Sequence, residues 1–93
     1  SQIRLQPKGI VNIELKKNVD VENMKELTCR LQDYKNDLLE GLGEAEEYRA
    51  LRNQFPDMHN ELQPKYNSIR EANSRLLGKI KAVDTLIENR AIS

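Results

Sequence analysis

Apolar residues in the second half of the chain recur at alternating spacings of four and three positions. This spacing predicts a helix with an apolar seam that repeats every 3.5 residues, which is typical of a coiled coil. Positions a and d of each heptad form such a seam, and they are buried when the helix packs against another. The members of this seam are Leu62, Tyr66, Ile69, Asn73, Leu76, Ile80, Val83 and Ile87.

The first half of the chain carries a shorter seam in the same heptad phase, within a helix that we expect over residues 18–53. Asp20 is a suitable N-cap, because its carboxylate can accept hydrogen bonds from the free amides of the first turn. Gly41 and Gly43 weaken the middle of this helix, each by about 1 kcal/mol relative to alanine. The seam residues are Met24, Leu27, Leu31, Tyr34 and Leu38.

Residues 1–17 follow a different pattern. Val11, Ile13 and Leu15 alternate with polar residues, and this period of two predicts a short strand. The segment has a net charge of +3, and a lone pair of strands is only marginally stable in water. We therefore expect a basic β-like arm that packs on its own helices or on a second copy, pairs with a partner's strand, or stays disordered.

Two prolines interrupt the helical pattern between the seams. Pro56 and Pro64 each lack the backbone N–H that a helix uses, and a proline in a helix interior costs about 3 kcal/mol. We therefore expect a break over residues 54–64, followed by a second helix over residues 65–93. Pro64 is suited to the first turn of that helix.

The two seams can be buried in two ways. The chain can fold back at the break into a helical hairpin, and hairpins can then pair into a four-helix bundle. Alternatively, two chains can run side by side as a long, interrupted parallel coiled coil. The prolines favour the hairpin, whereas the shared heptad phase and Asn73, which would pair with its mate, favour a parallel dimer over residues 62–90. Leu77 at e and Leu86 at g widen the seam beyond a two-helix stripe.

The composition fits long amphipathic helices. Of the 93 residues, 38% are hydrophobic, 32% are charged and only 4% are aromatic, and the net charge is zero. A neutral chain gives no basis for expecting nucleic acid or a membrane as a partner, and no apolar run approaches the roughly 20 residues that span a bilayer. The single cysteine, Cys29, cannot form an intrachain disulfide, which favours an intracellular protein, cytoplasmic or nuclear.

No residue pattern points to catalysis. His59 is the only histidine, and we expect it to be a seam residue beside the proline break rather than a base or a metal ligand. No metal-ligand spacing, phosphate-binding glycine loop or nucleophile motif is present in the sequence. We therefore expect neither enzyme activity nor a bound cofactor or metal.

These patterns predict a mainly all-α chain, either an interrupted coiled coil or a helical-hairpin bundle, with a short N-terminal β-like arm. The predicted function is a structural oligomerisation module that holds parts of a larger protein together through its seams, with a homodimer favoured over a tetramer. The alternative is a docking adaptor that captures another protein through the strand at residues 11–15 or through the widened helix face near Leu77 and Leu86.

Overall fold

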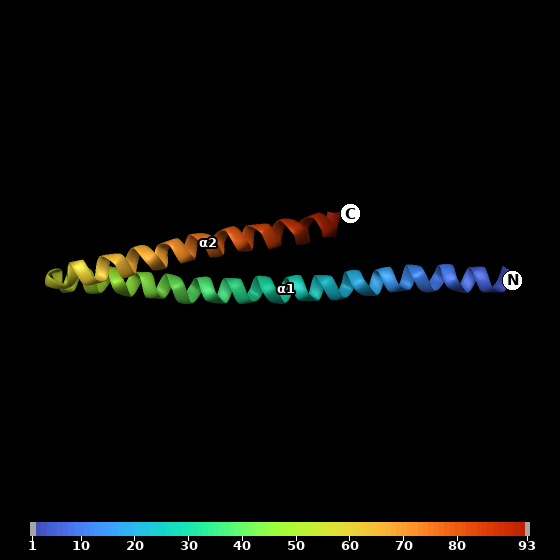
Figure 1. Cartoon of the computed structure of the whole chain (residues 1–93), viewed down its shortest axis with the longest axis horizontal. Coiled ribbons are helices and arrows are strands. Elements are labelled where there is room, and N and C mark those ends of the chain that lie inside the picture. The colour runs from blue at the N-terminus through green and yellow to red at the C-terminus, as the bar shows by residue number, and fades with distance from the viewer. Residues whose placement is uncertain (1, 93) are drawn as a thin grey trace.

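Two helices joined by a tight turn make up the part of the chain that the structure describes, residues 2–92 (Figure 1). In this computed structural model, α1 runs Gln2–Gln54, a single-turn 3-10 helix η1 runs Pro56–Met58, and α2 runs His59–Ile92. Side chains are described for residues 20–90, and the described chain contains no strand, so the predicted mainly α-helical class is confirmed. The β-like arm predicted for residues 1–17 lies outside the residues whose side chains are described, and it is not confirmed.

The turn between the helices is shorter than the break predicted for residues 54–64. Phe55 leaves helical geometry, with φ −122° and ψ 77°, because the ring of the following Pro56 disfavours the helical region for the residue before it. The amide of Phe55 still donates to the carbonyl of Leu51 at 2.7 Å, and the amide of Met58 donates to the carbonyl of Phe55 at 2.9 Å. These two bonds close the turn within about one helical turn of chain.

Pro64 lies inside α2, which begins at His59 instead of at residue 65 as predicted. A proline in this place deprives one carbonyl, that of Asn60, of its helical partner. Asn60 is exposed, so water can solvate that carbonyl. A single lost bond at an exposed site near the start of a long helix does not end the helix.

Three further positions in α1 differ from the simplest sequence expectation. The helix continues unbroken through Gly41 and Gly43, and neither glycine has a positive φ. Asp20 lies within the bounds of α1 and is not its N-cap. Its Oδ1 instead accepts a hydrogen bond from Nη1 of Arg90 at 3.1 Å, an ion pair between the two helices.

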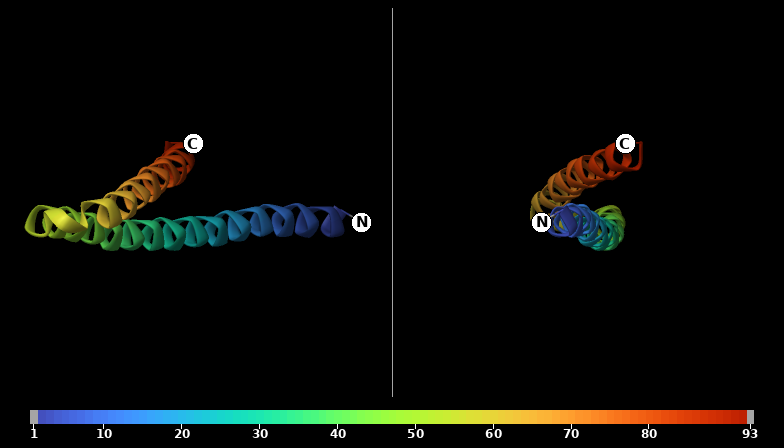
Figure 2. Two further views of the ribbon diagram at one scale, coloured as in Figure 1. Left: turned by 60° about the vertical axis from the view of Figure 1, so that its left-hand side comes forward. Right: turned by 90° about the vertical axis from the view of Figure 1, so that its right-hand side faces the viewer.

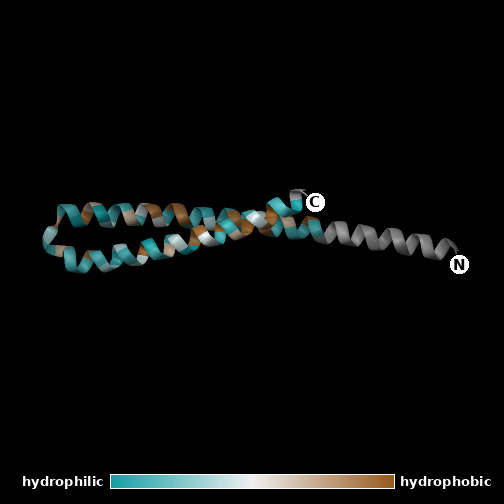
Figure 3. Cartoon of the chain, turned by 90° about the horizontal axis from the view of Figure 1, so that it is seen from above, coloured by the Kyte–Doolittle hydropathy of each residue, from teal (hydrophilic) through white to brown (hydrophobic). Residues whose placement is uncertain are grey.

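The helices are antiparallel and cross one another (Figures 1 and 3). In the view of Figure 1 α2 diverges from α1 toward the C-terminus, whereas in the view from above the two ribbons overlap at that end and separate at the turn. Figure 2 shows the same inclination of α2 from two further directions. The chain therefore adopts the folded-back alternative and not the extended parallel rod, because the break at Phe55 lets α2 return along α1 of the same chain.

The hairpin is a thin rod with little interior. The whole chain measures 83 × 17 × 14 Å. Leu62, with 5% of its surface exposed, is the one buried apolar residue in the described chain. The solvent-accessible surface is 7652 Å². A compact monomer of the same mass, 10.8 kDa, would expose about 5,500 Å². Two helices alone therefore leave an unusually large surface in water.

Candidate protein-interaction site

The seam between the helices contains every residue predicted for the oligomer interface. Each of them is buried or half-buried, whereas most of their sequence neighbours are exposed. In this structure the seam of α1 is covered by the seam of the same chain's α2. The members are Met24, Leu27, Leu31, Tyr34 and Leu38 on α1, and Leu62, Tyr66, Ile69, Asn73, Leu76, Ile80, Val83 and Ile87 on α2.

Gly41 and Asn73 approach each other closely across the seam. Gly41 is buried and Asn73 is 6% exposed, the one buried polar residue in the described chain. A Cβ atom added to Gly41 would collide with the side-chain Oδ1 of Asn73. With the asparagine side chain in this position, only the hydrogen atom of a glycine fits. The sequence predicted Asn73 to pair with its mate across a parallel dimer, and the structure instead packs it against Gly41.

Asn73 has a polar atom without a partner. Its Oδ1 is buried and accepts no hydrogen bond from any described residue. Leaving a buried polar atom unsatisfied costs about 1–3 kcal/mol. Such a residue favours one register over others, because sliding α2 along α1 would carry the asparagine away from the glycine and against a larger side chain.

Aromatic rings in the seam receive cations from both helices. The guanidinium carbons of Arg52 and Arg70 lie 5.1 Å and 5.7 Å from the ring centroid of Tyr66, and Nζ of Lys79 lies 5.6 Å from that of Tyr34. Cation–π contacts at exposed sites are worth about 0.5–1 kcal/mol each. Sequence reasoning did not find these pairs. The heptad phase does place Arg52 at seam position a, which indicated that the seam is not purely apolar there.

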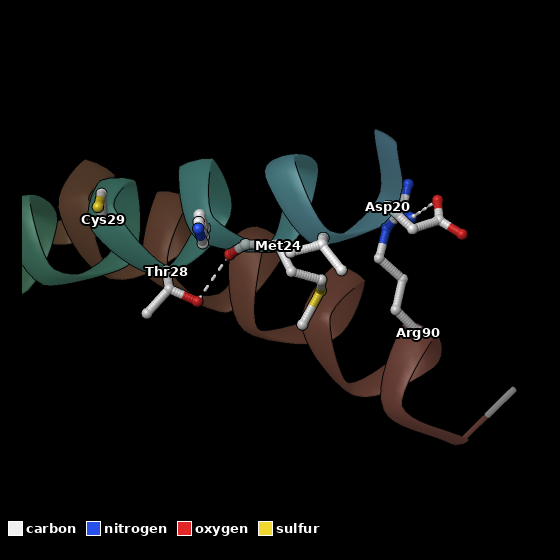
Figure 4. Close-up of a pocket in the computed structure, with 7 residues that line it drawn as sticks. Asp20, Met24, Thr28, Cys29 and Arg90 are labelled. Atoms are coloured by element: carbon white, nitrogen blue, oxygen red, sulfur yellow. Dashed lines mark hydrogen bonds and ion pairs between the residues drawn. The ribbon is translucent and has the colours of Figure 1, made fainter. Parts of the chain in front are cut away.

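A shallow groove opens beside the ion pair at the end of the hairpin (Figure 4). Figure 4 shows Arg90 reaching toward Asp20, with Met24, Thr28 and Cys29 following along α1. The hydroxyl of Thr28 donates to the carbonyl of Met24 at 2.7 Å, so it is satisfied within its own helix. The lining comes almost entirely from one helix, and it consists of Asp20, Val21, Met24, Lys25, Thr28, Cys29 and Arg90.

The histidine and the cysteine that the sequence analysis considered both lie at the surface. His59 is exposed beside the turn. Cys29 is a free, exposed thiol. No group of three or more histidine, cysteine, aspartate or glutamate side chains within residues 20–90 could hold a metal ion. Over the same part of the chain, neither helix has a stretch that is long and apolar enough to cross a membrane.

Exposed leucines mark one side of the hairpin, which we call the leucine side. It is defined by Leu39, Leu42 and Leu77, which are 68%, 45% and 56% exposed. Leu42 and Leu77 both occupy heptad position e. In an antiparallel pair of helices the e positions lie on the same side of the seam. A groove on this side contains both leucines together with Arg49 and Arg70.

Acidic residues mark the opposite side, which we call the acidic side. The acidic side chains on this side occupy heptad positions g and c of α1. One of them, Glu44, lines a separate groove together with Lys65 of α2. Leu86, 46% exposed, is at position g and so belongs to this side. Leu77 and Leu86 therefore flank the seam on opposite sides and do not form one widened face. The acidic residues of α1 on this side are Glu26, Asp33, Asp37, Glu40, Glu44 and Glu47.

Comparison with known families agrees with the two-helix architecture. The model of the family described as the VspR C-terminal bi-helical domain matches residues 25–91, more than two thirds of the chain. The chain belongs to this family. The matched range includes the paired parts of α1 and α2 and the turn between them, as the bi-helical description requires. Neither the curated proteins nor the solved structures contain a match to this chain.

Proposed function

We propose that this bi-helical domain is a structural oligomerisation module that holds parts of a larger protein together. The observation that supports it is the exposed surface. The whole chain exposes 7652 Å², about 2,100 Å² more than a compact monomer of its mass would. A stable protein–protein interface takes about 800 Å² from each partner, so the hairpin has ample surface to give to a second copy.

The state of the seam supports the same proposal. Seam residues such as Ile80 and Val83 are only half-buried in a two-helix hairpin, because each helix covers one flank of the other and leaves the rest in water. Adding two more helices would cover that remainder, as in a four-helix bundle. The proposed assembly is therefore a homodimer of hairpins, with the seam of each chain forming part of a shared core.

The experiment is a measurement of mass in solution. We expect size-exclusion chromatography with light scattering to give twice the mass of one chain, and the midpoint of thermal unfolding to rise with protein concentration. Small-angle scattering on the same peak would give a rod close to the length of one hairpin. A monomer at every accessible concentration would refute self-association and leave the docking-adaptor alternative.

A further inference from the structure

Large apolar side chains gather on the leucine side at the same height along the rod. Gly41 lies opposite Asn73. Because the helices are antiparallel, each residue added to the number on α1 is matched by one subtracted from the number on α2. Residues paired in this way lie at the same level, that is, at the same height along the rod. Leu39, two residues before Gly41, is therefore level with residue 75. Leu77 is two residues further, about 3 Å along the axis at 1.5 Å per residue. Both helices thus present leucine to the same band of the surface.

A two-fold axis parallel to the rod and lying over the leucine side makes this band self-complementary. Such an axis keeps every residue at its own level and places α1 of one copy on α2 of the other. Leu39 and Leu42 of one chain then meet Leu77 of the second chain, twice in the dimer. Every helix also gains an antiparallel neighbour, which is the arrangement of an up-down four-helix bundle.

The charges on this side match the same arrangement. Glu46, five residues beyond Gly41, is level with residue 68, and Arg70 is two residues from it. Lys25, five residues beyond Asp20, is level with residue 85, because Asp20 pairs with Arg90, and Glu88 is three residues from it. Neither Glu46 nor Glu88 forms an ion pair within the described chain. Both acids are therefore available to basic residues of a second copy at the same level.

From the leucines and these charge pairs we infer that two copies pack through their leucine sides about a two-fold axis parallel to the rod, with Glu46 of each copy against Arg70 of the other. This arrangement rests on the proposed oligomerisation function and specifies its interface.

Charge reversal tests the arrangement in trans. The variants are Glu46→Arg and Arg70→Glu, each made in the full chain and studied by sedimentation equilibrium. Each homodimer would contain two like-charge contacts, so we expect its dissociation constant to rise about tenfold. In an equimolar mixture the heterodimer would contain two opposite-charge contacts, because the two substituted side chains face each other at one site and the native pair remains at the other. We expect it to associate as tightly as the wild type.

A matched control lies on the acidic side. Glu40 and Arg75 are both exposed, both at position c, and within one residue of the same level. Glu40→Arg and Arg75→Glu therefore make the same charge changes away from the proposed interface. Neither variant should raise the dissociation constant of the dimer, and an equimolar mixture of the two should have the same dissociation constant as each variant alone. Far-UV circular dichroism on all four variants checks that each still forms the helical hairpin.

The possible outcomes distinguish failure of the proposed packing arrangement from failure of the oligomerisation function on which it rests. Weakened homodimers with a restored heterodimer support the arrangement. If the wild type is a dimer but mixing the two charge-reversal variants does not restore their association, the arrangement is wrong and the oligomerisation function still stands. A dimer that Arg70→Glu strengthens also overturns it, because a two-fold axis across the rod at the level of residues 75–76 would place Arg70 near Lys81 of the second copy. A monomeric wild type refutes both the arrangement and the proposed function.

Discussion

The seam and the leucine side distribute polarity in opposite ways. Inside the seam, the most buried side chain after Leu62 is polar, Asn73, and it lies against a glycine. On the leucine side, three large apolar side chains are exposed around basic residues. The comparison suggests that the seam selects one pairing of α1 with α2, whereas the leucine side supplies surface for association. The predictions below test this division, from the largest expected effect to the smallest.

A charge in the seam should destroy the hairpin itself. Ile80 is half-buried between the helices, and Ile80→Asp would place an unpaired carboxylate there, at a cost of about 2–4 kcal/mol. A two-helix hairpin has little stability to lose, so we expect a large fall in helical signal by circular dichroism, with loss of any dimer. Ala82→Asp, at an exposed position of the same helix, should leave the signal nearly unchanged. A fully helical Ile80→Asp variant would contradict the role of the seam.

A charge on the leucine side should instead separate copies without unfolding them. Leu42→Asp removes apolar contact from both halves of the proposed dimer, and we expect its dissociation constant to rise about 100-fold or more. The control is Leu86→Asp on the acidic side, because Leu86 and Leu42 are almost equally exposed, at 46% and 45%. Sedimentation equilibrium measures both. Equal effects of the two variants would remove the distinction between the sides.

Gly41 and Asn73 should be coupled. A methyl group at Gly41 collides with Asn73, so Gly41→Ala should destabilise the hairpin by about 1–3 kcal/mol. In an Asn73→Ala background the collision is gone, and the same change should stabilise by up to about 1 kcal/mol through helix propensity. Urea unfolding at one protein concentration measures all four chains of this cycle.

Gly43 provides the control for that cycle. A Cβ atom at Gly43 meets no other atom within 4 Å. Gly43→Ala should therefore stabilise the hairpin by about 1 kcal/mol in either background. If Gly41→Ala proved as stabilising as Gly43→Ala in the wild-type chain, the close approach of the two helices would be disproved.

The smallest expected effect concerns a like-charge contact in the proposed dimer. Lys35, one residue beyond Tyr34, is level with residue 78, and Lys81 of the second copy would lie three residues away. Lys81→Glu would replace repulsion with attraction on the rim of the interface. Rim pairs are worth about 0.2–1 kcal/mol, so we expect association to tighten only a few-fold, with less effect at high salt. Weaker association of this variant would count against the parallel two-fold arrangement.

Sequence reasoning located much of this structure and missed specific contacts. The alternation of apolar residues marks the side of each helix that lies against the other, and Pro56 marks where the chain turns. The register of Gly41 with Asn73 and the cations around Tyr66 were not predicted, because a residue's own heptad position does not reveal what stands opposite it. The break was also predicted too long, because Pro64 sits near an exposed helix start where one lost hydrogen bond is tolerated.

The sequence by itself determined that the chain beyond residue 17 is mainly helical and which stripe of each helix avoids water, since both follow from the local periodicity of its side chains. The tertiary structure alone decided that α2 returns along α1 of the same chain, that Asn73 meets Gly41, and that Leu42 and Leu77 share one side while Leu86 lies on the other. The physical reason is that a heptad seam accepts many partners and registers. The turn at Phe55 and the space beside one glycine select among them.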